Sequence, residues 1–405
     1  MQIMKNSTYS AGICKTLSQC LALAAVILAS ASNAFAQSES EARLSLLAAE
    51  NIPSLQQARS VNDDSVQVVF HFEDYYRRLI DDMGRALEDD MSIRLIPVIG
   101  VSHLQSVYDQ LYLKGMDLSI IHSDVLEYLA RTQNYERVFT HINAVGTLYR
   151  EKIAVIAGSK YETMADLADQ EVNFGFTGKG SDLAGTILFD TLDINVNPVR
   201  LEKFEAIEKV KSGELAATVF LLEDAPAQLK ALSPEDNVTV LPVPNTEELL
   251  SVYSADSFDH SEFPQIIDEG DTLLTLSASV IIASYNWRDE NNSRYKKLDR
   301  FVTALMANLD TLKTDEQFDD AWKTVSFDAE VPGVQRLPMV QAILDQQEAE
   351  AQRIADEKLA EELQLIVDAQ NALVERLNAR IEETSDPDEL ESLLVQLQDL
   401  LEDIQ

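Results

Sequence analysis

Apolar and polar positions along the first part of the chain predict short buried strands, each followed by a helix. Apolar runs typical of strands lie at Val66–Phe70, Ile93–Ile99 and Leu118–Ile121, and helical spacing follows them at Tyr75–Leu87, Leu104–Tyr112 and Val125–Arg131. Strands that alternate with helices in this way indicate parallel β-α-β units.

The pattern changes after Val138. Ala144–Tyr149 and Lys152–Ala157 are predicted as two neighbouring strands, and shorter strands alternate with helices after them. Thr272–Ala283 is a long apolar run rich in β-branched residues, and its position suits a strand that crosses back to the first group of elements. We therefore expect an α/β protein.

A glycine-containing turn lies in the middle of this second group. Val172–Phe176 is predicted as a buried strand, Thr177–Ser181 as a loop, and Asp182–Leu192 as a helix. Gly178 and Gly180 permit positive φ, so backbone N–H groups can converge at the helix N-terminus, where a carboxylate or phosphate binds readily. The alternative is an ordinary strand–turn–helix connection with no ligand.

Two sharper interpretations of this loop fail. A Walker A loop has Ser or Thr directly after its lysine, whereas Gly180 follows Lys179. The dinucleotide-binding fingerprint has a third glycine where this chain has Leu183.

The last section of the chain predicts two amphipathic helices. Val340–Glu383 contains no glycine or proline, and Asp386-Pro387-Asp388-Glu389 then provides an N-cap, a proline at the first helical position and a capping-box acid. Their apolar stripes comprise Ile343, Ile354, Leu363, Ile366, Leu373, Leu377 and Ile381, and then Leu390, Leu393, Leu394, Leu397, Leu400, Leu401 and Ile404. We expect residues 336–405 to form a helical hairpin or coiled-coil arm. Self-association, partner docking and packing on the body all remain open for it.

The first 36 residues are typical of a cleavable secretory signal. Lys5 and Lys15 supply the positive region, Leu21–Leu28 the apolar region, and Ala34-Phe35-Ala36 the small-residue cleavage site. We expect an exported, periplasmic protein with a polar lead-in at residues 37–64. Because both cysteines lie in the signal, the mature chain would have no disulfide and no thiolate metal site.

The charge excludes some partners. Without the two signal lysines the chain has 30 basic and 69 acidic residues, a net charge of −39. Nucleic acid and anionic lipid would be repelled by such a surface.

The sequence contains no recognised catalytic motif. The five histidines show no i, i+4 metal-ligand spacing, and the side chains of adjacent His122, Ser123 and Asp124 point in different directions. There is neither a nucleophile elbow nor a cysteine nucleophile. We expect no enzyme activity, no cofactor and no metal site.

Several predicted strands end in loops that carry polar side chains. Ligands of open α/β sheets bind at such strand ends. The loops are Phe70–Tyr76, Gly100–Gln105, His122–Asp124, Thr177–Asp182 and Leu221–Pro226. Together they predict a pocket between two lobes. Taken singly, Ser102, Ser123 or Asp124 can also be a helix cap.

The stretch Ile93–Leu129 resembles the TAXI-type solute-binding receptors of TRAP transporters. That family has a strand of the form RLVPV, a Gly-x-Gly-Ser loop, a helix ending Asp-Leu-x-Tyr-Leu-x-Gly-x-Asp and a strand ending Gln-Ser-Asp-Val. The corresponding stretch here reads IRLIPVIGVSHLQSVYDQLYLKGMDLSIIHSDVLEYL. Further similar segments are Lys152–Ala157, Val172–Phe189, Leu241–Pro244, Ala283–Trp287 and Tyr295–Leu305, so the resemblance covers roughly residues 66–327.

The resemblance implies a two-lobed periplasmic-binding-protein type II fold. Lobe 1 would comprise residues 65–141 and 272–335, and lobe 2 residues 142–271, followed by the C-terminal arm. The family captures a small organic acid or amino acid between its lobes and passes it to TRAP membrane subunits. Closure of the lobes on the ligand is the expected mechanism.

This chain departs from the family at several loops. The glycine- and threonine-rich loop after the first strand is replaced by Phe70–Tyr76, the Gly-Lys-Gly-Ser loop by Gly100–His103, and a Gly-Lys-Pro segment by Glu223–Pro226. Lys179 is the one cation left in these loops, so the pocket can prefer a zwitterionic, neutral or cationic solute. Alternatively, Phe70, Phe72, Tyr75 and Tyr76 fill the pocket.

Our prediction is a solute-binding receptor of the TAXI type with TRAP permease subunits as partners. The ligand-binding residues predicted from the loops are Phe72, Tyr75, Ser102, Ser123, Asp124, Thr177, Gly178, Lys179, Gly180, Ser181, Phe220 and Glu223. Phe72, Tyr75 and Phe220 are expected to be apolar walls. The alternative is an interaction or sensory protein with a blocked cleft, in which the arm binds a partner or a second copy.

Overall fold

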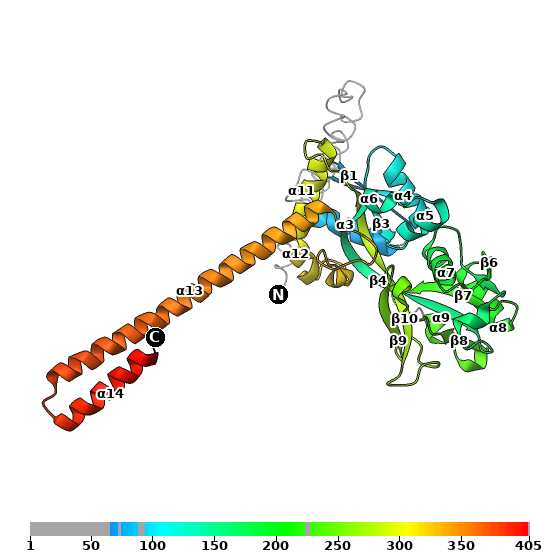
Figure 1. Cartoon of the computed structure of the whole chain (residues 1–405). Coiled ribbons are helices and arrows are strands. Elements are labelled where there is room, and N and C mark those ends of the chain that lie inside the picture. Colours follow the sequence, from blue (N-terminus) through cyan, green and yellow to red (C-terminus); the bar gives the residue numbers. More distant parts are fainter. Residues whose placement is uncertain (1–64, 72–73, 88–93, 223–226, 404–405) are drawn as a thin grey trace, which may run out of the picture. The chain divides into compact units, whose positions relative to one another are not determined.

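The computed structural model describes residues 65–71, 74–87, 94–222 and 227–403 (Figure 1). The predicted signal and lead-in lie outside these residues, as do the predicted site residues Phe72 and Glu223. Within the described part of the chain, no helix combines the length and apolar character needed to cross a membrane.

The first group of strands forms parallel β-α-β units, as predicted. Strand β1 (Ser65–His71) lies between β2 (Arg94–Gly100) and β3 (Met116–His122), and it is parallel to both. Helices α3 (Asp74–Ala86), α4 (His103–Tyr112) and α5 (Val125–Gln133) follow the three strands in turn. The carboxyl ends of these strands therefore meet at one edge of the sheet.

Two long antiparallel strands connect the strands before Ile142, which we call the first half of the body, with the strands between Gly158 and Thr272, which we call the second half. β4 (Ile142–Gly158) pairs with β10 (Thr272–Tyr285), and the residues of β4 beyond Lys152 also pair with β7 (Ala217–Leu222) and β8 (Val238–Leu241). The prediction of two separate strands in this part of the chain was wrong. Charged residues 150–152 interrupt the apolar run, but the backbone pairing continues through them.

The remaining strands complete one sheet in the order β2-β1-β3-β10-β4-β7-β5-β6, with β8 also on β4 and β9 on β10. The strands are β5 (Glu171–Asn173), β6 (Asn197–Val199) and β9 (Ser254–Asp259), and the helices of this region are α6 (Val138–His141), α7 (Gly180–Thr191), α8 (Lys203–Ser212), α9 (Ala227–Lys230) and α10 (Glu247–Leu250). The described residues also form three 3₁₀-helices, η2 (Met164–Leu167), η3 (Pro234–Asp236) and η4 (Asp320–Thr324). Strand β5 is shorter than predicted, because extended pairing ends at Asn173.

The apolar core joins the two halves of the body. One buried cluster contains Val125 and Leu129 of α5 together with Leu183 and Ile187 of α7. Two further clusters cover the opposite sheet face, one in each half. The two halves therefore share one continuous core on the α5–α7 side.

The chain then attaches to β4 before it enters the C-terminal helices. After α11 (Ser293–Ala307) and α12 (Leu309–Thr314), Ser326 exchanges backbone hydrogen bonds with Thr147, and Leu337 N–H donates to the Ala144 carbonyl at 2.8 Å. The next helix, α13 (Pro338–Glu383), buries Met339 and Val340 at its start.

The C-terminal hairpin is present, and with it the predicted fold class is confirmed. Helix α14 (Pro387–Asp403) contacts the last part of α13, where Leu377 and Leu393 are buried (Figure 1). Between these contacts, residues 345–369 are exposed at every position. This stretch of α13 therefore packs against no other described part of the chain, which leaves self-association and partner docking open.

Candidate functional site

A cavity of about 630 Å³ lies where β1, β3 and the loop Thr177–Ser181 meet. We call this loop the glycine loop. It is lined by His71, Tyr76, His103, His122, Tyr149, Glu151, Gly175, Phe176, Lys179, Gly180, Ser181, Leu201, Glu202, Lys203, Leu221 and Leu222. We call it the cleft cavity. Its volume is within the range of small-molecule sites, and both halves of the body contribute to it.

Three histidines lie together in the wall of the cleft cavity. His71 ends β1, His103 begins α4 and His122 ends β3. The ring centroids of His103 and His122 are 4.0 Å apart in a stacked arrangement, and those of His71 and His103 are 5.3 Å apart. The i, i+4 spacing of metal-binding histidines does not reveal this cluster, because the three residues lie far apart in the sequence. A usable signal was present, because three of the predicted strand-end loops each carry one histidine.

His122 forms an ion pair with a carboxylate from the central strand. Its Nε2 lies 3.3 Å from Glu151 Oε2, and Tyr149 Oη donates to Glu151 Oε1 at 3.3 Å. Burial favours a lower pKa for His122, but the nearby Glu151 carboxylate outweighs it and raises the pKa. Burial likewise favours a higher pKa for Glu151, yet His122 holds that pKa below its usual value. Each group of the pair therefore favours the charged form of the other.

The other two histidines are neutral near pH 7. Burial, followed by the charge of Lys179, lowers the pKa of His71 to about 4. Burial and the charge of His122 place the pKa of His103 well below its usual value. The Nδ1 atoms of both His103 and His122 are buried, and among the described residues neither has a hydrogen-bond partner. Both atoms are therefore buried polar groups without a hydrogen-bond partner in this part of the chain, and the His122 Nδ1 faces Gly180.

The glycine loop is pressed against the first half of the body. Gly178 has a φ of +77°, and a Cβ added to it would lie 2.9 Å from Leu104 Cβ. A Cβ on Gly180 would lie 2.5 Å from His122 Cε1. Only glycine permits this close approach of the two halves.

Internal hydrogen bonds already occupy part of the loop. Gly178 N–H donates to Asp182 Oδ2 at 2.8 Å, and Arg200 Nη1 lies 2.5 Å from the other oxygen of this buried carboxylate. The Gly178 carbonyl accepts from Leu104 N–H at 3.3 Å. The loop is therefore held in place by Asp182, and the Gly178 amide is not free for a ligand.

Only some of the predicted site residues line the cleft cavity. Lys179, Gly180 and Ser181 do. Thr177, Gly178 and Ser102 are not among the lining residues, and Ser102 Oγ caps α4 by accepting from Gln105 N–H at 3.1 Å. The capping alternative for Ser102 is thus the geometry observed.

The remaining predicted residues lie elsewhere. Ser123 and Asp124 are buried directly after His122. Phe220 is 1% exposed, packs in one of the core clusters and is not among the residues that line the cavity. Tyr75 is in the first turn of α3, and its side chain lies outside the described part of the structure, together with Phe72 and Glu223.

Asp124 forms a buried link between the halves. Tyr253 Oη donates to Asp124 Oδ2 at 3.0 Å. Burial raises the pKa of Asp124 to about 6, against the influence of His122 and Tyr253. Burial and the Asp124 charge also raise the pKa of Tyr253 well above its usual value.

In the described residues no group of three or more histidine, cysteine, aspartate or glutamate side chains is arranged to hold a metal ion. His103 stacks on His122 and lies tilted against His71, which is the arrangement of packed imidazoles and not of convergent metal ligands.

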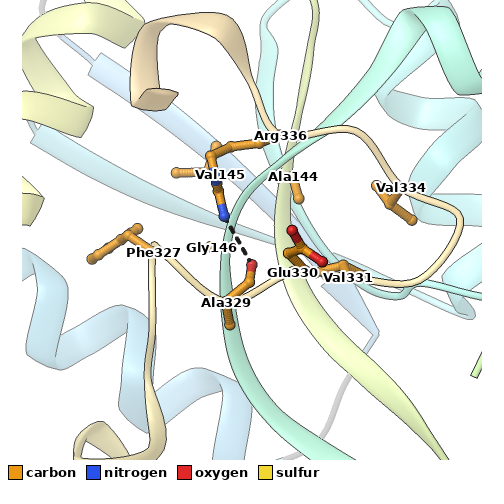
Figure 2. Close-up of a pocket in the computed structure, with 9 residues that line it drawn as sticks. All are labelled: Ala144, Val145, Gly146, Phe327, Ala329, Glu330, Val331, Val334 and Arg336. Carbon is orange, nitrogen blue, oxygen red and sulfur yellow. Dashed lines mark hydrogen bonds between the residues drawn. The ribbon is translucent and has the colours of Figure 1, made fainter. Parts of the chain in front are cut away.

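A second cavity of about 320 Å³ lies beside residues 144–146 of β4 (Figure 2). We call it the rear cavity, and it is enclosed by residues 144–146 of β4 and by the segment 327–336. Arg336 is the one basic residue among the described residues that line it, and its Nη2 donates to the carbonyls of Asp328 at 2.7 Å and Ala329 at 3.2 Å. Since that guanidinium is already bound, the cleft cavity is the better candidate site.

Comparisons with known proteins identify structural neighbours but no family. Neither a protein-family model nor a curated protein matches the chain. Solved structures similar to it include a TctC solute-binding protein from Polaromonas, with a TM-score of 0.35 at 15% identity over 61% of this chain and 88% of that one.

Two further neighbours are also described as periplasmic binding proteins. The aliphatic sulphonate binding protein SsuA from Escherichia coli has a TM-score of 0.37 at 14% identity, covering 70% of this chain and 78% of its own. A periplasmic binding protein from Brucella ovis with glutathione bound has a TM-score of 0.34 at 12% identity, over 70% and 84% of the two chains. At this level of similarity, these neighbours say nothing about which ligand this chain binds.

Proposed function

We propose that the protein is an exported receptor that captures a small acidic or zwitterionic solute in the cleft cavity. The observation that supports this most is a cavity built by both halves of the body and lined by Lys179, Lys203 and the first turn of α7. A helix N-terminus and two cations attract a carboxylate. The buried Nδ1 atoms of His103 and His122 provide further hydrogen-bonding groups.

The finer identity we propose is a TAXI-type receptor of a TRAP transporter. It is supported by the resemblance of residues 66–327 and by the predicted signal at residues 1–36. On this proposal the protein works in the periplasm and delivers its solute to TRAP membrane subunits.

Thermal unfolding of the mature protein against a panel of organic acids, amino acids and amines tests the receptor. A solute at about 100 times its dissociation constant adds roughly 2.7 kcal/mol of stability. This raises the unfolding midpoint by a few degrees. The protein is first mildly unfolded and refolded to release any ligand retained from purification. A flat panel after this step would contradict the receptor function.

Replacement of Lys179 by alanine tests the site itself. We expect Lys179→Ala to weaken binding of an acidic solute roughly tenfold, because a charge-assisted hydrogen bond is lost. The matched control is Lys114→Ala, which removes an exposed lysine that does not line the cavity. Equal affinities of the two variants, measured by calorimetry, would remove Lys179 from the site.

The exposed stretch of α13 favours a second candidate function, which is partner binding or self-association through the arm. Ile354, Leu359, Leu363 and Ile366 are each more than half exposed. Exposed apolar patches on otherwise soluble proteins often mark interaction sites. Sedimentation velocity over a range of protein concentrations distinguishes the two cases, because self-association predicts a concentration-dependent dimer and partner binding predicts a monomer.

A further inference from the structure

Flat rings make up a large share of the cleft cavity wall. Six lining residues carry a ring: His71, Tyr76, His103, His122, Tyr149 and Phe176. Tyr76 stacks on Tyr149 with ring centroids 6.3 Å apart, and His103 stacks on His122. These rings are buried and already packed against one another.

Phe176 differs from the other rings. It lies between β5 and α7 and lines the cavity, yet it is 52% exposed. Among the described residues it has no aromatic ring contact. A large apolar ring with a free face at the cavity provides a surface on which a planar ligand can stack.

The charges beside Phe176 favour an anion. Neither Lys179 nor Lys203 has an ion-pair partner among the described residues. The two carboxylates among the described lining residues are engaged, since Glu151 pairs with His122 and Glu202 accepts from Phe204 N–H at 2.9 Å. Among these described residues the remaining charge is positive, and a buried carboxylate would find compensation there.

We propose that the solute of the cleft cavity is an aromatic carboxylic acid, with its ring against Phe176 and its carboxylate between Lys179, Lys203 and the first turn of α7. This inference rests on the proposed receptor function and narrows it to one substrate class. The Nδ1 of His103, which has no hydrogen-bond partner among the described residues, would bind a polar substituent on the ring, such as a hydroxyl.

Matched probes separate the ring from the carboxylate. Thermal unfolding and calorimetry are run with benzoate, 4-hydroxybenzoate, cyclohexanecarboxylate, benzylamine and succinate. We expect benzoate to bind roughly fivefold more tightly than cyclohexanecarboxylate, which has similar size and charge but no aromatic ring. 4-Hydroxybenzoate should bind at least as tightly as benzoate, and benzylamine should not bind.

Substitutions at Phe176 test its part in recognition. We expect Phe176→Leu to weaken benzoate binding roughly fivefold and to leave cyclohexanecarboxylate binding unchanged, while Phe176→Tyr keeps the ring and restores the preference. Phe204→Leu is the matched control, because Phe204 is 42% exposed in the same half and does not line the cavity. Far-ultraviolet circular dichroism confirms that each variant is folded.

The outcomes distinguish this inference from the proposed function. Equal binding of benzoate and cyclohexanecarboxylate, or binding of succinate or the wider panel without benzoate, overturns the aromatic class and keeps the receptor. Binding of benzylamine alone overturns the proposed charge. No response to any probe or panel compound overturns both.

Discussion

The cleft cavity and the rear cavity lie along the same strand, β4, but differ in what their polar groups contact. At the rear cavity, Ala144 and Thr147 are hydrogen-bonded to the segment 326–337, and Arg336 is bound by carbonyls. In the cleft cavity, the Nδ1 atoms of His103 and His122 and the ammonium groups of Lys179 and Lys203 have no such partner among the described residues. Free polar groups, more than volume, therefore indicate where a ligand binds.

The physical reason is the cost of burying a polar group without a partner. At the rear cavity, the polar groups already have partners in the hydrogen bonds that attach the segment leading to α13. We therefore assign it a structural role. In the cleft cavity, this cost remains at the buried Nδ1 atoms of His103 and His122.

The largest expected effect comes from removing a wall of the rear cavity. Phe327 is 3% exposed, and its ring faces Gly146, where an added Cβ would lie 2.6 Å from Cδ1 (Figure 2). Phe327→Ala should lower the free energy of unfolding by about 3–5 kcal/mol, because a large buried ring is lost. Urea unfolding measures this, and Val334→Ala is a milder control at a half-buried position.

A structural role for the rear cavity also predicts that solute affinity in the cleft is unchanged by Phe327→Ala. Calorimetry below the unfolding range tests this. A large loss of affinity would break the distinction between the two cavities.

An intermediate effect is expected at Asp124, behind the cleft cavity. Its pKa is raised from 3.8 to about 6, so the folded protein binds more protons than the unfolded chain between these pH values. This contribution to stability is present below about pH 4 and is lost as pH rises towards 6.

The Asp124→Asn variant has no carboxyl group at this position and does not lose this contribution as pH rises. The free energy of unfolding of the variant minus that of the wild type should therefore be about 2–3 kcal/mol larger at pH 7 than at pH 4. His71 and His103 have lowered pKa values, so their contribution to stability rises with pH. Because both proteins contain these histidines, this contribution cancels when the two free energies are subtracted. Urea unfolding at several pH values gives the comparison. A difference that does not vary with pH would show that Asp124 titrates normally.

The smallest effect on the body is expected from the hairpin. Leu393 is 2% exposed against α13, whereas its neighbour Leu394 is 49% exposed. Leu393→Ala should speed amide hydrogen exchange in α14 and change the stability of the body by less than about 0.5 kcal/mol, because local units open separately. Leu394→Ala is the control. Faster exchange in β4 as well would show that hairpin and body unfold together.

Sequence reasoning found the glycine loop of the site but not the wall opposite it. Lys179, Gly180 and Ser181 follow one another in the chain, so local pattern was enough to single them out. His71, His103 and His122 come from three separate strand–helix units, and only the strand order β2-β1-β3 brings them together. Glu151 joins them because β4 continues through its charged residues.

Phe220 shows a different limit. The apolar run of β7 predicts a strand buried on both faces, so period-two alternation does not reveal which side chains face the cavity. Phe220 and Leu222 pack in the same core cluster, yet Leu222 also lines the cavity together with Leu221, and Phe220 does not.

The sequence by itself determined the alternation of strands and helices, the glycine loop before α7 and the two C-terminal helices. Each of these depends on local propensity, capping and periodicity, which short segments carry on their own. Only the tertiary structure decided the continuity of β4, the histidine cluster, the free face of Phe176 and the exposure of residues 345–369. These features depend on pairing and packing between residues far apart in the chain, where no local pattern records which surfaces meet.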